Sequence, residues 1–479
     1  MKSKKFVLAA LALLAITGLL ALAGCKNDTV PPEVEKQEQG DGGGSETDKN
    51  DTVPETPKYT VTFNANGGST VASQTVESGQ KAKEPAEPEL EGSWFLGWYS
   101  DEGLAKKFDF NTPITTATPV YAKWSYKLHT KPTTLTNYTS SHAPEGTWTY
   151  VEFGDWPQTI LKGDVKVDET KSKEMGMFTY YLGDDGNHYV KAEEKAYEAG
   201  YKYSDGSDVN QKDESGSPST QWFKVEPIVW RVLTEDYKDP DGNSTGNALL
   251  LAEKILTGGV RYYVDTSTRP ITGAGTKEGN PNTVYPNNWQ YSTIRAWLNG
   301  SYEEKDSQLK TYTGKGFLQT AFTQSAQTLI ADTTVDNSAA STNPASNSEE
   351  WNSGKNEYAC GKTTDKVFLL SEAEATTGAH LKEKDITDED YGFDEYWWAG
   401  TGNTRIRVTT DYAKATGAYQ GDSSAGYDGL WWLRSPDCDG EGYACIINDD
   451  GSATLNDFDI VYRTDEGVVP ALSISLTGN

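Results

Sequence analysis

The chain has 479 residues, with 71 acidic and 43 basic side chains and a formal net charge of −28. A protein this acidic repels phosphate backbones and anionic membrane surfaces, which argues against nucleic acid as a partner. The length leaves room for two or three domains, and the 27 Tyr, 14 Trp and 46 Gly residues favour turn-rich β structure over helical bundles.

Residues 1–24 have the pattern of a bacterial export signal, in which three lysines precede an apolar run at 6–23. The motif L-A-G-C at 22–25 resembles a lipobox, the sequence at which bacterial lipoproteins are cleaved and acylated on the cysteine. The resemblance implies that Cys25 carries diacylglycerol and palmitate, and that the chain is exported and anchored to membrane lipid. The alternative is that the apolar run remains as a single membrane-spanning anchor.

Residues 25–58 predict a disordered tether behind the lipidated cysteine. They are rich in Pro, Glu, Asp, Gly, Ser and Thr and contain almost no large apolar side chain. Such a segment cannot build a core. As a random coil it would span several tens of Å, which holds the folded part away from the lipid headgroups.

Residues 59–126 predict the first folded unit. Apolar residues alternate at 59–63 and 71–76 around the turn N-A-N-G-G, and G-W-Y-S-D, F-D-F, T-P-I-T and V-Y-A-K-W follow in that order. This series resembles the Listeria–Bacteroides repeat, also called the internalin B-type repeat. The resemblance implies a small β-grasp-like module of bacterial surface proteins. We expect Trp98 and Trp124 to lie in its core rather than to bind a ligand.

Residues 128–479 predict a larger, β-rich α+β domain with a few helices. The apolar run at 227–233 is typical of a buried strand, and 248–252 is its expected partner. Helical spacing of apolar residues predicts one helix at 292–299, where Ser292 is a plausible N-cap, and a second at 317–329.

The last third of this domain alternates between polar and apolar stretches. The Ser-, Asn-, Thr- and Gly-rich segment 332–365 predicts an exposed loop. A buried strand at 367–371 and a short helix from Glu372 follow, and residues 430–472 predict a terminal meander of hairpins.

The larger domain also carries a set of motifs that resembles a known but uncharacterised family. The motifs V-W-R-V-L, S-T-I-R-A-W-L-N, D-K-V-F-L-L-S, W-W-L-R-S-P and G-V-V-P-A-L resemble, as an ordered set over 150–476, an uncharacterised domain of bacterial surface lipoproteins. Val469 stands where that family commonly has Arg. The terminal arrangement is similar to the C-type-lectin-like fold of formylglycine-generating enzymes and of ligand-binding lipoproteins, a likeness that implies fold rather than function.

No catalytic signature is present, because the sequence lacks G-x-S-x-G, H-E-x-x-H, Walker A and dinucleotide-binding motifs in a suitable context. We expect the four histidines to lie on the surface or in loops, and we expect no cofactor. Cys438 and Cys445 are spaced for a disulfide across a hairpin. The alternative is a reactive pair like that of formylglycine-generating enzymes.

Oxygen-rich turns near the C-terminus offer weak calcium candidates. Asp437, Asp439 and Asp449 lie in turns of the kind that can supply Ca²⁺ ligands. We favour the alternative that these are solvated turn residues, which tolerate left-handed backbone geometry.

The terminal strands also predict a ligand-binding face. Trp431 and Trp432 are neighbours on a predicted strand, so their side chains point to opposite faces and only one is expected in the core. The exposed tryptophan would share a face with Arg434, Tyr443, Asp449, Asp450, Asn456 and Tyr462. Aromatic and hydrogen-bonding groups together suit an extracellular protein or a glycan.

The sequence as a whole predicts a lipid-anchored, surface-exposed binding or adhesion protein. A first alternative is an envelope enzyme, either a glycan-active hydrolase that uses two of the acids or a relative of the formylglycine-generating fold. A second alternative is a structural envelope protein.

Overall fold

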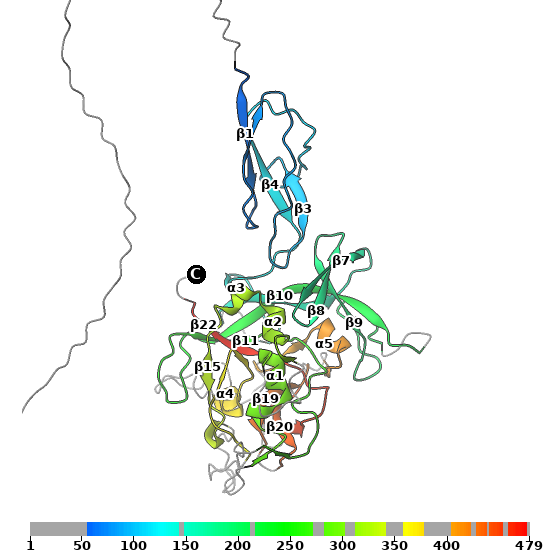
Figure 1. Ribbon diagram of the computed structural model, residues 1–479. Helices are drawn as coiled ribbons and strands as arrows, with labels where there is room; N and C mark the ends of the chain where they lie inside the picture. The colour runs from blue at the N-terminus through cyan, green and yellow to red at the C-terminus, as the bar shows by residue number, and fades with distance from the viewer. Residues whose placement is uncertain are drawn as a thin grey trace, which may run out of the picture. The chain divides into compact units, whose positions relative to one another are not determined.

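The computed structural model describes ten stretches of the chain, shown in colour in Figure 1: residues 55–142, 148–210, 216–271, 282–301, 312–341, 358–377, 404–422, 428–437, 440–453 and 458–476. The predicted export signal, Cys25 and most of the predicted tether lie outside them. Within the described residues, no helix has the length and apolar character needed to cross a membrane. These residues form mostly β-strands with short helices, which agrees with the predicted β-rich α+β class.

The first module is a four-stranded sheet formed by β1 (Lys58–Asn64), β2 (Gln74–Glu77), β3 (Phe95–Tyr99) and β4 (Thr118–Trp124). The strand order is β2-β1-β4-β3, with β1 and β4 parallel at the centre and an antiparallel strand on each side (Figure 1). No helix forms among the described residues between β2 and β3, and the β-grasp-like assignment of this module stays a prediction.

The core of this module is aromatic, as expected from its sequence. Trp98 is 1% exposed and its ring meets Phe63 edge-on, with ring centroids 5.0 Å apart. Trp124 is also buried, and its Nε1 donates a hydrogen bond to the carbonyl oxygen of Ala65 at 2.8 Å. That bond ties the N-A-N-G-G turn to the sheet. Both tryptophans are therefore core residues, which confirms the prediction.

A nine-stranded sheet is the centre of the larger module. Its strands are β5 (Thr133–Leu135), β6 (Tyr150–Ile160), β7 (Val167–Met175), β8 (Phe178–Gly183), β9 (His188–Glu193), β10 (Thr220–Thr234), β11 (Ala248–Ala252), β17 (Val367–Phe368) and β22 (Ala471–Ile474). The order is β17-β22-β11-β10-β9-β8-β7, and β6 pairs with both β10 and β5. The predicted pairing of β10 with β11 is confirmed, with Trp230 opposite Ala252.

The helices are short: α1 (Thr293–Asn299), α2 (Phe317–Ala321), α3 (Gln324–Gln327), α4 (Glu372–Thr377) and α5 (Asp411–Ala415), with 3-10 turns η1 (Trp289–Tyr291) and η3 (Ala339–Ser341). Helix α1 matches its prediction. The Ser292 hydroxyl accepts a hydrogen bond from the Arg295 amide, and Gly300 ends the helix in the left-handed conformation.

The single helix predicted at 317–329 is instead two helices, α2 and α3. Phe322 is extended between them, and the hydroxyl of Thr323 accepts a hydrogen bond from the Ala326 amide and starts α3. Phe322 is buried with its ring centroid 4.9 Å from that of Phe153. A core contact and a new N-cap therefore interrupt the helical periodicity.

Small sheets complete the module: β12 (Lys254–Ile255) with β18 (Val408–Thr409), β13 (Arg269–Pro270) with β14 (Thr283–Val284), β15 (Thr333–Val335) with β16 (Thr363–Asp365), and the antiparallel β19 (Trp431–Pro436), β20 (Tyr443–Ile447) and β21 (Phe458–Ile460). The terminal meander thus forms, but β22 leaves it to pair with β11 and β17 in the large sheet. The segment expected to be a loop at 332–365 pairs its two ends as β15 and β16.

The expectation that all histidines are exposed or in loops is wrong for His188. This residue begins β9 and is fully buried, with its Nε2 2.8 Å from the Ser125 hydroxyl. Burial, with a smaller effect of the Lys173 charge, lowers its pKa to about 3. His188 is therefore a neutral core residue at physiological pH.

Candidate functional site

The two tryptophans predicted to flank a ligand face are both in the core. Trp431 and Trp432 are each 0% exposed. The indole nitrogen of Trp431 donates to the Arg405 carbonyl oxygen at 3.2 Å, and the Trp432 ring lies 5.7 Å from the ring of Tyr262. Other segments therefore cover both faces of β19, and the expectation that one tryptophan is exposed is wrong.

Arg434 is likewise a core residue and not part of an exposed face. It is 1% exposed, and its guanidinium forms an ion pair with buried Glu374. It also donates hydrogen bonds to the carbonyl oxygens of Leu369 at 2.7 Å and Asp336 at 2.9 Å. These contacts join β19 to the segments around α4 and β15. The charged side chain of Arg434 therefore stabilises the core and is not available to a ligand.

The other predicted face residues differ in exposure. Tyr443 and Tyr462 are exposed, at 36% and 42%. Asp449 accepts a hydrogen bond from the Tyr419 hydroxyl at 3.3 Å, and partial burial raises its pKa. Asp450 caps its own turn by accepting from the Ser452 amide at 2.8 Å, and Asn456 lies outside the described residues. Ligand binding by this face stays a prediction.

The disulfide and calcium predictions involve residues outside the described part of the chain, namely Cys438 and Asp439. Cys445 is buried, with its Sγ 3.5 Å from a carboxylate oxygen of Glu372. Asp437 is only 2% exposed. Among the described residues, no group of three or more His, Cys, Asp or Glu side chains is arranged to hold a metal ion.

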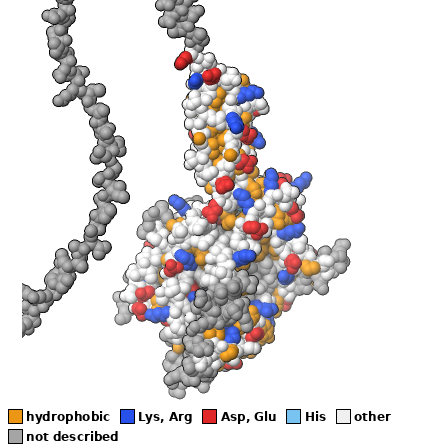
Figure 2. All heavy atoms as spheres, in the orientation of Figure 1, with side chains coloured by type: hydrophobic (Ala, Val, Ile, Leu, Met, Phe, Trp, Pro, Cys, Tyr) orange, Lys and Arg blue, Asp and Glu red, His pale blue; other side chains and the backbone are white. Residues whose placement is uncertain are grey.

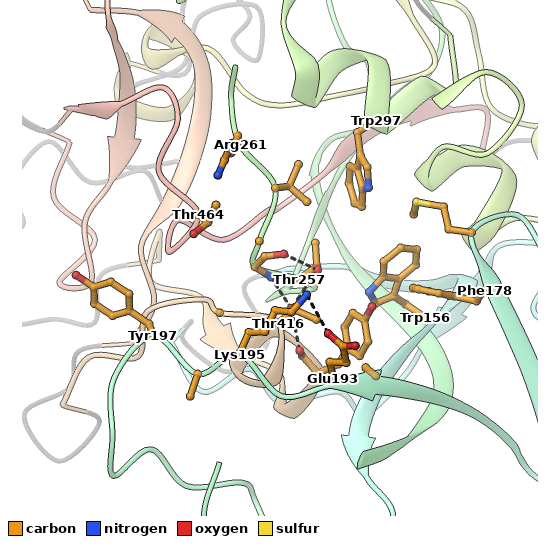
Figure 3. A pocket seen from close by; sticks show the side chains of 18 of the residues that line it. Trp156, Phe178, Glu193, Lys195, Tyr197, Thr257, Arg261, Trp297, Thr416 and Thr464 are labelled. Carbon is orange, nitrogen blue, oxygen red and sulfur yellow. Dashed lines mark hydrogen bonds and ion pairs between the residues drawn. The ribbon is translucent and has the colours of Figure 1, made fainter. Parts of the chain in front are cut away.

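A cleft of about 820 Å³ lies elsewhere in the larger module and brings together residues far apart in sequence. Its lining comes from β6, from β8 and β9 with the residues that follow β9, from the segment 257–261, from α1 and α5, and from Thr464. Figure 3 shows Trp156, Phe178 and Trp297 on one side and Arg261, Thr464 and Tyr197 on the other, with Lys195 and Glu193 between them. Sequence reasoning selected none of these residues.

The back of the cleft is made of two glycine-containing segments that touch through their backbones. A Cβ on Gly258 would lie 2.1 Å from the amide nitrogen of Ala418, so no side chain fits there. Gly259 has a φ of +75° and donates a hydrogen bond to the Thr464 carbonyl oxygen at 2.8 Å. The Thr416 hydroxyl accepts from the Gly258 amide at 2.9 Å. These contacts make the wall rigid and explain the T-G-G motif.

The aromatic side of the cleft is fixed by core packing. Trp156 is 1% exposed, and its Nε1 donates to the Leu256 carbonyl oxygen at 3.0 Å. Its ring centroid lies 4.8 Å from that of Phe178, 6.0 Å from Trp297 and 6.3 Å from Tyr412. Phe178 is only half-buried and offers the most open ring on this side. Phe178 is therefore the ring that a ligand can contact most, above a layer of buried rings that ligand binding need not reorganise.

The polar side of the cleft carries an excess of positive charge. Of the described residues, Lys191, Lys195 and Arg261 line it together with a single acid, Glu193. Lys195 Nζ lies 3.4 Å from a Glu193 carboxylate oxygen, and both side chains are well exposed. Lys191 Nζ lies 5.2 Å from the centroid of the Trp222 ring. Arg261 is exposed and forms no ion pair within the described residues.

Comparison with known proteins identifies two regions of the chain. Two proteins of Evansella cellulosilytica, named "Putative membrane protein" and "Putative Gly-rich membrane protein", are 45% and 42% identical to the chain over 73 residues. These 73 residues are 15% of this chain and only 11% and 8% of those proteins. The chain contains a Listeria-Bacteroides repeat domain at residues 59–123 and matches a domain of unknown function, DUF6273, at residues 245–476.

Proposed function

We propose that the protein is a surface-exposed binding protein, anchored to the cell envelope by lipid on Cys25. The Listeria-Bacteroides repeat supports an envelope location, since such repeats are typical of surface proteins, and the two relatives carry the names of membrane proteins. The lipobox-like motif supports the lipid anchor. Replacement of Cys25 by Ser should abolish palmitate labelling and release the chain from the membrane fraction. Retention of Cys25→Ser in the membrane would favour a spanning anchor.

The cleft bounded by Trp156, Trp297 and Arg261 is the proposed ligand site. The observation that carries this proposal is its shape and lining: a concave space of about 820 Å³ with a rigid aromatic side and a few polar groups opposite. Binding sites for small ligands and for short pieces of polymers commonly have this composition. A C-type-lectin-like fold for the larger module fits the proposal as a scaffold for recognition, but does not identify the ligand.

The chemistry of the lining favours binding over hydrolysis. Glycoside hydrolysis by acids uses two carboxyl groups on either side of the scissile bond. The described lining holds one carboxylate, Glu193, and it is paired with Lys195. No His or Cys is among the described residues that line the cleft. The described lining can therefore position a ligand, and it lacks the second carboxylate that glycoside hydrolysis by acids uses.

Two exposed tyrosines distinguish the two candidate ligand sites, the cleft and the terminal strands. Tyr197 lines the cleft and is 38% exposed, and Tyr462 lies beyond β21 and is 42% exposed. Purified full chain would be screened on arrays of glycans and extracellular proteins, and the affinity of the best ligand measured for each alanine variant. We expect Tyr197→Ala to weaken binding at least about tenfold, a loss of about 1.4 kcal/mol, while Tyr462→Ala leaves it unchanged. The reverse result would place the site on the terminal strands.

A further inference from the structure

We propose that the ligand of the cleft is an acidic glycan, bound with the apolar face of a sugar ring on the aromatic side and its carboxylate or sulfate facing Arg261 and Lys195. This inference rests on the proposed function, because it assigns a ligand class to the same site. It depends on the charge of the lining and on the separation of aromatic and cationic groups within it.

The charge of the cleft is opposite to that of the chain. Acids outnumber bases by 71 to 43 in the whole chain, whereas three cations and one acid are among the described residues that line the cleft. On the face of the molecule shown in Figure 2, acidic and basic side chains are interspersed. A local excess of positive charge on an acidic protein is selective, since it attracts an anionic group at short range while the rest of the surface repels large polyanions.

The three cations differ in how they are held. Lys195 is paired with Glu193 at 3.4 Å, and Lys191 Nζ lies 3.5 Å from Glu169 and over the Trp222 ring. Arg261 has no such partner among the described residues, and it is exposed. A guanidinium presents parallel N–H groups that match a carboxylate or sulfate. Arg261 is therefore the principal anion contact, and Lys195 is the second.

The arrangement of the lining explains why a sugar acid fits better than other anions. Trp156 and Phe178 lie across the cleft from Arg261 (Figure 3), so a ligand must be apolar on one side and charged on the other. A pyranose ring has an apolar face of C–H groups and carries its carboxylate or sulfate at the ring edge. At physiological salt the Debye length is about 8 Å, so a short oligosaccharide experiences the cleft cations more than the distant acids.

Matched ligands test the charge requirement on the full chain purified in detergent. The probes are a galacturonate hexasaccharide, its fully methyl-esterified form, and a heparin-derived hexasaccharide, each measured by calorimetry. We expect the acidic sugars to bind at least tenfold more tightly than the ester, and the affinity to fall between 50 and 500 mM salt. The heparin-derived probe distinguishes sulfate from carboxylate as the preferred group.

Charge-reversal variants test the assigned contacts. Arg261→Glu should lower the affinity for the acidic hexasaccharide more than tenfold, and Lys195→Glu should lower it by a smaller factor. Lys166→Glu is the matched control, since this exposed lysine lies outside the cleft and should leave the affinity unchanged. Circular dichroism of each variant would show that the fold is retained.

The possible failures separate the inference from the proposed function. If the esterified hexasaccharide binds as tightly as the acid and Arg261→Glu has no effect, while Tyr197→Ala still abolishes binding, the ligand is a neutral glycan and only the inference is overturned. Tighter binding of a polyglutamate peptide or of oligothymidylate would overturn it in favour of that class. If no array ligand responds to Tyr197→Ala, the cleft is not the binding site and both proposals fail.

Discussion

Glu466 provides a quantitative test of the electrostatics in the larger module. Its side chain is 0% exposed and lies beside the carboxyl groups of Asp459 and Asp465. Burial raises its pKa to about 10, together with a side-chain hydrogen bond to Asp459 and the negative charges of Asp465 and Asp459. The folded protein therefore holds Glu466 protonated at neutral pH, whereas the unfolded chain ionises it.

The free-energy consequence follows from proton linkage. An acid whose pKa is raised on folding destabilises the protein increasingly as the pH rises from its unfolded pKa to its folded pKa. Between an unfolded pKa of about 4.5 and pH 7.5, the penalty for Glu466 reaches about 4 kcal/mol, at 1.36 kcal/mol per pH unit. Glu466→Gln keeps the shape and removes the titration. We expect it to stabilise the protein by up to about 4 kcal/mol at pH 7.5 and by almost nothing at pH 4.5.

Urea denaturation of the wild type and of Glu466→Gln at pH 4.5, 6, 7.5 and 9 would measure this difference. The matched control is Glu374→Gln, because Glu374 is equally buried but paired with Arg434. Breaking that pair leaves a buried charge and should destabilise the protein by about 3–5 kcal/mol. A Glu466→Gln effect that is independent of pH, or destabilising at pH 7.5, would refute the reasoning.

Three further predictions follow from buried groups. The lowered pKa of His188, about 3, means that stability is lost as the pH falls below about 6.5. In urea denaturation, the free energy of unfolding should be about 2 kcal/mol lower at pH 5 than at pH 7.5. This difference should be smaller in His188→Gln. Gly258→Ala should destabilise the fold and weaken ligand binding because its Cβ would collide with Ala418, whereas Gly163→Ala, with nothing within 4 Å, should change neither stability nor binding. Trp98→Ala should lower the free energy of unfolding of the repeat by about 3–5 kcal/mol, measured by thermal unfolding. A smaller effect would argue against a role of Trp98 in the core.

The sequence predicted the elements that begin and end at signals from a few neighbouring residues. Helix α1 begins at the residue after Ser292 and ends before Gly300 because a cap hydrogen bond and a left-handed glycine are properties of a few neighbouring residues. The β10–β11 pairing follows from two apolar runs close in sequence. The break at Phe322 was not predicted, because it depends on a contact with Phe153 that the helical periodicity does not reveal.

The same reasoning explains why the candidate site was not found from sequence. Alternation along β19 correctly places Trp431 and Trp432 on opposite faces, but it carries no information on whether a second layer covers each face. The cleft joins Trp156 to Trp297 and Tyr412, which are separated by more than a hundred residues along the chain. The T-G-G sequence at 257–259, which sequence reasoning did not select, is a local signal that could have indicated this wall, since adjacent glycines permit close backbone approach.

The structure also shows that the matched family range is smaller than the unit that forms the cleft. The DUF6273 match begins at residue 245, just before β11. All five residues of β11 belong to the buried core, and β11 pairs with β10 along one edge and with β22 along the other. Strand β10 lies before the match, as do Trp156, Phe178 and Lys195 of the cleft. A fragment that began at 245 would expose an apolar strand edge and lose the aromatic side of the cleft. The unit that forms the cleft therefore includes the strands from β6 onward, and the cleft lining comes from residues on both sides of that boundary.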